Sequence, residues 1–208
     1  AARPGTRRAG RTTGAPDTSG TDVRIALGRL KALVREALAP SESVRVRQEP
    51  ADLERTRELR ARWPDLPGIV VARFDGPVGL YRVVDDQEWA EITRTGRIVG
   101  GRFAVKAERA VGASWGTNLD QVIAFGLQWK RAGRLRGQLR VLRIDGYDRQ
   151  FGHLEPGVSD EELSTQGARM AVKACSTGLG CSVADVTLAD VDRAWELGDD
   201  GRLTPFEP

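Results

Sequence analysis

Two short stretches of this sequence combine residue types that could bind a charged ligand. The first is Leu80-Tyr81-Arg82, and the second is Ser114-Trp115-Gly116-Thr117. A guanidinium offers a planar set of N–H donors that suits phosphate oxygens. The second stretch places small hydroxyl residues where a strand is expected to end and a helix to begin. The two stretches together are the candidate site of the chain, provided that the fold brings them close to each other.

The first stretch lies in a predicted strand. Ile69 to Phe74 is rich in β-branched residues, and Asp75-Gly76-Pro77 then turns the chain into a second strand from Val78 to Val84. Two strands this close in sequence favour antiparallel pairing with each other. Tyr81 and Arg82 are adjacent, so they point to opposite faces of their strand. The simplest placement is an interfacial tyrosine and a solvent-exposed arginine; the alternative is that one of the two faces a cleft.

Capping signals predict a helix after each stretch. Asp85 can cap a helix in which Glu88 completes a capping box, Ile92 lies on the buried side and Gly96 ends the last turn. Asn118 can cap a second helix after Thr117, with Gln121 at the capping-box position. A loop or lid with some strand around residues 103–105 is expected between the two, and residues 138–144 and 183–188 read as further strands.

The N-terminal part is expected to differ from the rest. Residues 1–20 are rich in Gly, Thr, Pro and Arg and predict a disordered linker, attached to an upstream domain of a longer chain. Residues 21–66 predict a helical region, with one helix starting at Thr21-Asp22 and another from Ala51 to Trp63. The remaining residues, 67–208, are expected to form the functional domain.

The pattern of residues 78–144 resembles the ADP-ribosyltransferase-like superfamily. Leu80-Tyr81-Arg82 is similar to its first motif, in which an arginine or histidine lies near the end of a strand. Ser114-Trp115-Gly116-Thr117, with Ala124-Phe125-Gly126 further along the helix, is similar to its second motif. The resemblance implies an α+β fold with a mixed, largely antiparallel split sheet and N-terminal helices. It also implies NAD as the cofactor.

The resemblance assigns roles to these residues. Arg82 would hold the diphosphate or ribose, Ser114 and Thr117 would support the pocket by hydrogen bonding, and Tyr81 or Trp115 would stack near the nicotinamide. Cleavage of the bond between nicotinamide and ribose produces an oxocarbenium-like centre, which a carboxylate stabilises. An acidic third motif is therefore the residue that the hypothesis most needs.

The acidic motif is not found where the family pattern would place it. Gly180-Cys181-Ser182 stands before the predicted strand at residues 183–188 instead of a glutamate motif. Either Glu162 or Asp185 takes the role, or the site has lost transferase activity. Glu162 has a structural alternative, because Ser159-Asp160-Glu161-Glu162 is typical of a helix N-terminus.

Composition excludes several other classes. The net charge of +3 is small for 208 residues, so the pI near 9.2 is weak support for a nucleic-acid binder, and no clustering of arginines with exposed aromatics is visible in the sequence. His153 is the one histidine and is expected in a loop, while Cys175 and Cys181 lack zinc-site spacing, so no metal site is expected. No apolar run is long enough for a membrane span.

The sequence therefore predicts a soluble NAD-dependent ADP-ribosyltransferase with a protein or nucleic-acid acceptor, as a toxin-like effector that is secreted or delivered into a target cell. NAD hydrolysis with water as acceptor is the related alternative. A non-catalytic binding module that keeps the fold is the alternative from another class, favoured by the missing acidic motif. Arg82 and Glu162 are the expected catalytic residues, and Cys175 and Cys181 are either free thiols or one disulfide bridge.

Overall fold

The computed structural model describes residues 44–65, 68–100, 109–154 and 181–208. The described residues all belong to the unit that spans Pro40–Pro208. The predicted linker, the helix expected from Thr21 and the strand expected at residues 103–105 lie outside the described residues.

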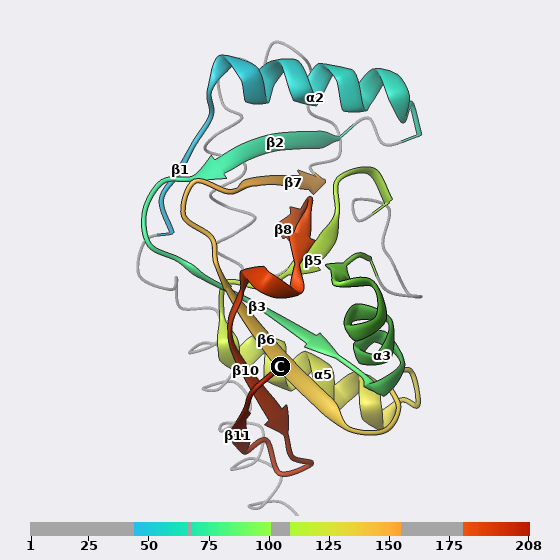
Figure 1. Cartoon of the computed structure of the whole chain (residues 1–208). Helices are drawn as coiled ribbons and strands as arrows, with labels where there is room; N and C mark the ends of the chain where they lie inside the picture. Colours follow the sequence, from blue (N-terminus) through green and yellow to red (C-terminus); the bar gives the residue numbers. More distant parts are fainter. Residues whose placement is uncertain (1–43, 66–67, 101–108, 155–180) are drawn as a thin grey trace, which may run out of the picture. The chain divides into compact units, whose positions relative to one another are not determined.

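Two antiparallel sheets make up the described part of this unit (Figure 1). The first sheet has the order β1 (Val46–Arg47), β2 (Ile69–Phe74), β7 (Gln150–Leu154), β8 (Cys181–Val183) and β5 (Ala113–Trp115). The second has the order β11 (Leu203–Phe206), β10 (Val191–Leu197), β6 (Leu139–Asp145) and β3 (Gly79–Val84). A short pair joins β4 (Arg97–Ile98) to β9 (Val186–Thr187), and the 3-10 turn η1 (Leu188–Asp190) follows. The expected α+β class with a largely antiparallel, divided sheet is confirmed.

Strands β2 and β3 continue one another across the corner between the sheets, and so do β6 and β7. β3 pairs with β6 in one sheet and β2 pairs with β7 in the other. At the corner, Gly146 N–H donates to the Val78 carbonyl at 2.8 Å and Asp148 N–H donates to the Phe74 carbonyl at 3.1 Å. The register shifts by one residue there, as is usual where strands switch sheets. The expected pairing of β2 with β3 is therefore wrong, because the chain crosses over at Asp75-Gly76-Pro77 instead of reversing.

The helices are α2 (Pro50–Arg62), α3 (Asp86–Thr95) and α5 (Leu119–Arg131). Both expected caps are confirmed: Asp85 accepts the Glu88 N–H at 3.0 Å, and Asn118 accepts the Gln121 N–H at 3.0 Å. Gly96 ends α3 with a φ of 68°, a left-handed conformation that glycine adopts without steric cost. These local signals fix the two helices that follow the candidate site.

Two other sequence-based expectations are corrected. The strand expected over residues 183–188 is broken into β8 and β9 by a turn at Asp185, where φ is 52°. His153 lies in strand β7, opposite Val70, and not in a loop. The cause is in both cases tertiary pairing, which decides strand ends more than local composition does.

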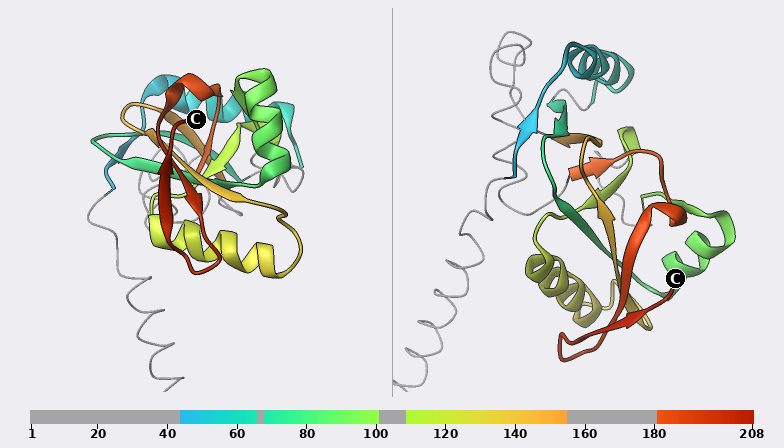
Figure 2. Two further views of the ribbon diagram at one scale, coloured as in Figure 1. Left: turned by 60° about the horizontal axis from the view of Figure 1, so that its bottom comes forward. Right: turned by 60° about the vertical axis from the view of Figure 1, so that its left-hand side comes forward.

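The second sheet has a helix on each face (Figure 2). Leu80 and Val84 of β3 belong to the main core with Ile92 of α3, and this core also contains Phe74, Phe151 and other side chains of the first sheet. The alternate residues of β3 face α5, where Tyr81 and Val83 pack with aliphatic side chains of the helix. The period-two alternation of β3 thus decides that Tyr81 and Arg82 lie on different faces.

Helix α2 covers an edge of β2 that the two-residue strand β1 leaves open. Thr56 Oγ1 accepts the Val71 N–H at 3.0 Å, and the Gln48 amide donates to the Val71 carbonyl at 2.8 Å. Arg60 Nε donates to the Ile69 carbonyl at 3.0 Å. Side chains at the helix therefore satisfy backbone groups that a longer neighbouring strand would otherwise bond.

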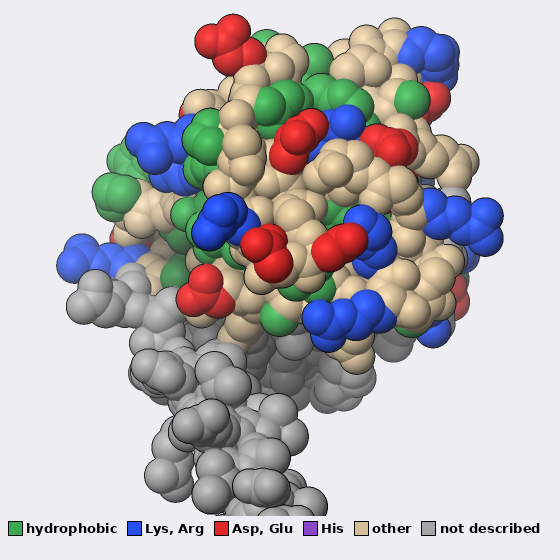
Figure 3. Space-filling view, turned by 90° about the horizontal axis from the view of Figure 1, so that it is seen from below, with side chains coloured by type: hydrophobic (Ala, Val, Ile, Leu, Met, Phe, Trp, Pro, Cys, Tyr) green, Lys and Arg blue, Asp and Glu red, His purple; other side chains and the backbone are tan. Residues whose placement is uncertain are grey.

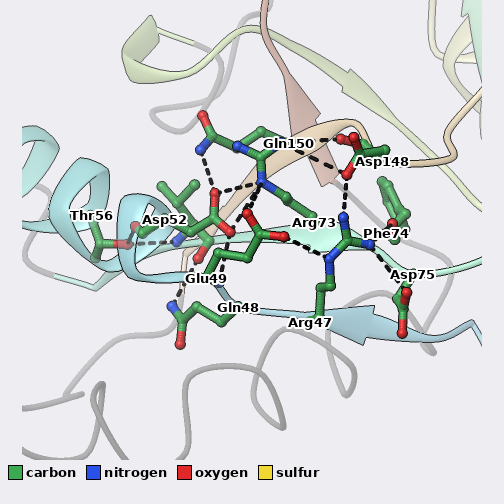
Figure 4. A network of polar contacts seen from close by, with 11 residues as sticks. Arg47, Gln48, Glu49, Asp52, Thr56, Arg73, Phe74, Asp75, Asp148 and Gln150 are labelled. Atoms are coloured by element: carbon green, nitrogen blue, oxygen red, sulfur yellow. Dashed lines mark hydrogen bonds and ion pairs between the residues drawn. The ribbon is translucent and has the colours of Figure 1, made fainter.

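A buried carboxylate attaches α2 to the first sheet (Figure 4). Asp52 is 0% exposed, and it accepts bonds from Arg73 Nε at 3.1 Å, from the Gln150 amide at 2.6 Å and from the Glu49 backbone N–H at 2.9 Å. The buried face of the helix consists of Asp52, Thr56 and Leu59. Two of these three residues are polar, so the helix is held by hydrogen bonds as much as by apolar contact.

Gly126 lets α5 approach β3 closely. A Cβ atom at this position would lie 2.9 Å from both methyl carbons of Val83. We expect Gly126→Val to lower the free energy of unfolding by about 1–3 kcal/mol, since the stiff Val83 side chain cannot move aside. Urea denaturation measures the effect. Ala124→Val on the exposed side of α5 is the control, and Gly126→Val that costs no more than this control would contradict the close approach.

Asp190, in the turn before β10, forms an ion pair with Arg149, the residue before β7. Partial burial raises the pKa of the Asp190 carboxyl, but bonds from Arg149 at 2.6 Å and from Thr187 N–H at 2.8 Å outweigh it, so the pKa lies below its ordinary value. The unfolded value is about 3.9, so this contribution is complete above that pH and is lost as the pH falls through the lower folded-state pKa.

The pH dependence of Asp190→Asn tests this linkage. We expect the variant to be less stable than the original chain at pH 7 and the difference to shrink as the pH falls below about 4. Urea denaturation at pH 7, 5 and 3 measures it, with the exposed Asp199→Asn as control. A stability difference that does not change with pH would contradict the linkage.

Candidate functional site

The two candidate stretches meet at one backbone pair. Tyr81 of β3 and Gly116 after β5 exchange both backbone hydrogen bonds, each at 2.8 Å. β3 belongs to the second sheet and β5 to the first, so this pair joins the two sheets at the point where each motif stands. Residues that are more than 30 positions apart in sequence thereby become neighbours.

Arg82 is buried and bonded to both neighbouring segments. It is 9% exposed, so a solvent-exposed position is wrong. Its Nε donates to Glu88 Oε1 at 2.8 Å, and its Nη1 donates to the Ser114 carbonyl oxygen at 2.6 Å. The guanidinium thus connects β3, the first turn of α3 and β5. Charge-assisted bonds of this kind are stronger than neutral ones, and burial strengthens them further.

The pleat of β5 determines which side chains face Arg82. Ala113 and Trp115 are buried in the main core, and Ser114 between them points to the opposite face of the strand. The Ser114 atom that Arg82 contacts is the main-chain carbonyl. Across the strand pair, Ser114 stands opposite Ser182, whose buried hydroxyl has no hydrogen-bond partner among the described residues.

The two aromatic residues of the motifs are packed within the protein. Trp115 is fully buried in the main core, and its indole N–H finds no partner within the described ranges. Tyr81 is half-buried and packs in the cluster beneath α5. Trp115 is therefore not accessible for stacking on a ligand, and Tyr81 is accessible only in part. Thr117 is half-buried in the bend before the Asn118 cap.

Glu88 is a carboxylate for which the sequence predicts only a place in the helix cap. It is 17% exposed, holds Arg82, and borders a hollow of about 250 Å³. The lining of this hollow consists of Asp85, Gln87, Glu88, Glu91, Ile92, Arg97, Val99, Gly100 and Leu135. One signal in the sequence could have suggested Glu88. It lies six residues after Arg82, and the capping box places it on the first turn of the next helix.

An adjoining hollow of about 180 Å³ shares the rim residue Arg97. Arg109 and Asp185 also border it. Asp185, the second acidic candidate of the sequence, is 91% exposed and lies 3.8 Å from Arg97 Nη2. Carboxylates and guanidinium groups border both hollows. Small ligand sites usually measure about 300–1,000 Å³, so each hollow by itself is smaller than a typical ligand site.

The remaining site predictions fall outside the described residues. Glu162 is one of them, and Cys175 is another. Within the described ranges, no group of three or more His, Cys, Asp or Glu side chains could hold a metal ion. Likewise, no helix among these residues has the length and apolar character that crossing a membrane requires.

Comparisons of this chain with protein-family models, with curated proteins and with solved structures gave no match. The function must therefore be argued from the arrangement of Arg82, Glu88 and the β3–β5 junction.

Proposed function

We propose that this chain transfers ADP-ribose from NAD to a macromolecular acceptor, at the junction of β3 and β5. The observation that carries the proposal is the contact of Arg82 with both Ser114 and Glu88, at 2.6 and 2.8 Å. It joins an arginine, the main chain of a serine-containing strand and a carboxylate, and Glu88 supplies the carboxylate from the helix after the first motif, not from the place where the family pattern has its acidic motif. NAD hydrolysis, with water as the acceptor, uses the same site and the same first step.

The buried position of Arg82 supports a positioning role. Its guanidinium is bonded to Glu88 and to a main-chain carbonyl, so it orients the carboxylate and holds the two strand ends together. Arg97 is a better candidate for the diphosphate, because it is 65% exposed at the rim shared by both hollows. A guanidinium at that rim can form a bidentate contact with phosphate oxygens.

Glu88 is the carboxylate we assign to the chemical step. The bond between the ribose C1′ and the nicotinamide nitrogen breaks, and its electron pair leaves with nicotinamide. The acceptor atom then bonds to C1′ and loses its proton. A carboxylate that faces C1′ stabilises the positive charge that develops on the ribose. Glu162 retains this role as the alternative, and the variants below distinguish the two.

Nicotinamide release from NAD by the full chain tests the proposal. We expect Glu88→Gln to reduce the rate by about 100-fold or more, the usual cost of losing one electrostatic contact to a transition state. Glu58→Gln, an exposed carboxylate on α2, is the matched control and should leave the rate unchanged. A loss in Glu162→Gln with full activity in Glu88→Gln would assign the chemistry to Glu162.

The absence of NAD turnover in the original chain, with and without protein or nucleic-acid acceptors, would overturn the transferase and hydrolase proposals together. Calorimetry with NAD then separates the remaining cases. Binding without turnover would indicate a non-catalytic module that keeps the site, and no binding would end the NAD hypothesis.

A further inference from the structure

The outer side of α5 carries aromatic and cationic side chains that the proposed NAD site does not use. We call this surface the α5 patch; it consists of Phe125, Trp129 and Arg134. Phe125 is 40% exposed, and its ring lies 4.5 Å from that of Trp129 at an angle of 39°. Arg134 is exposed and follows the turn at the end of this helix. The opposite side of α5 is buried against β3 and β6.

The turn after α5 holds Arg134 against Trp129. Gly133 has a φ of 68°, and the Arg134 N–H donates to the Trp129 carbonyl at 2.9 Å. This turn places the guanidinium carbon 5.0 Å from the centre of the Trp129 ring. The patch therefore has two flat aromatic rings and a cation stacked on one of them, fixed by backbone geometry.

The charge around the patch is of one sign along the chain. Residues 121–143 contain Lys130 and five arginines, and no aspartate or glutamate. On the face seen from below, cationic and anionic side chains lie interspersed (Figure 3). Lys130, Arg140 and Arg143 form ion pairs with Asp199, Asp86 and Asp192. Arg134 is exposed and places its cation over the Trp129 ring.

We infer that the α5 patch binds single-stranded nucleic acid. Exposed aromatic rings stack on unpaired bases, and arginines beside them neutralise phosphates and stack as well. A duplex keeps its bases stacked and offers no such faces, while an acidic polypeptide would use the charges but not the rings. The overall charge of the chain gave no indication of this surface, because the clustering arises only when the helix and its end turn bring these side chains together.

Fluorescence anisotropy with labelled single-stranded DNA and RNA 12-mers of mixed sequence, at about 50 and 200 mM salt, tests the inference. The full chain is used without NAD, so the result does not depend on the proposed activity. We expect the association constant to fall with added salt. A plot of its logarithm against the logarithm of the salt concentration should have a slope of about −0.7 for each phosphate neutralised.

Variants of the patch make the test specific. Trp129→Ala should weaken binding by at least about tenfold, Trp129→Phe should retain it, and Arg134→Gln should reduce the salt slope by about 0.7. Tyr147→Ala and Arg94→Gln, an exposed aromatic and an exposed arginine on other elements, are the matched controls. Circular dichroism of each variant checks that it remains folded.

Three results would overturn the inference. The first is equal loss of binding in the controls and in the patch variants. The second is binding of polyglutamate as tight as that of the oligonucleotides, which would indicate an acidic polypeptide as partner. The third is a dimer in sedimentation that Trp129→Ala dissociates, which would indicate that a second copy of the chain covers the patch.

Discussion

Arg82→Met is expected to lower the free energy of unfolding by about 3–5 kcal/mol, because it leaves the Glu88 carboxylate without its buried cation and the Ser114 carbonyl without its donor. The variant should also lose nicotinamide release, since the carboxylate and the strand end are no longer held together. Urea denaturation and the release assay measure the two effects separately.

The matched control is Arg94→Met, which removes an arginine from an exposed pair with Glu91 and should change stability by no more than about 1 kcal/mol. The double variant Arg82→Met/Glu88→Leu should recover part of the lost stability, because it leaves no buried charge unpaired. If Arg82→Met lowers the free energy of unfolding by less than about 1 kcal/mol, the buried contacts of Arg82 with Glu88 and Ser114 do not hold this site together.

Asp52→Ala is expected to cost about 2–4 kcal/mol, because it removes a fully buried carboxylate and leaves Arg73, the Gln150 amide and the Glu49 N–H without their acceptor. Asp52→Asn keeps the shape and should cost less. Hydrogen exchange at the Val71 amide should speed up in Asp52→Ala, since its acceptor Thr56 lies on the same helix.

Glu58→Ala, on the exposed side of α2, is the control for this prediction and should stay within about 0.5 kcal/mol of the original chain. Faster exchange in both variants, or in neither, would contradict the view that Asp52 attaches the helix to the sheet.

Local signals in the sequence were sufficient for individual elements. The β-branched run of β2 and the capping residues Asp85 and Asn118 predicted their elements closely, because each signal lies within a few residues of the backbone group that it satisfies. The partners of the strands were not predictable in this way. Asp75-Gly76-Pro77 has the composition of a hairpin turn, and only the pairing of β2 with β7 shows that it is a corner between sheets.

The candidate site was also predictable only where local signals decide it. The alternation of Tyr81 and Arg82 was predictable from strand geometry, but the burial of Arg82 depends on α3 and β5, which are remote in sequence. The contact of Glu88 with Arg82 was not predicted, because the capping box already explained a glutamate at this position. The buried face of α2 was also missed, because Asp52 and Thr56 do not contribute to a hydrophobic periodicity.

The way in which α2 completes the first sheet has a consequence for self-association. Backbone groups of β2 that a neighbouring strand would bond are bonded by the side chains of Thr56, Gln48 and Arg60. A molecule in which α2 has detached from the sheet therefore exposes unpaired peptide groups along β2. Such a row is a template for cross-β stacking of identical chains. Gentle heating should therefore make Asp52→Ala turbid and thioflavin-positive at temperatures where the Glu58→Ala solution stays clear.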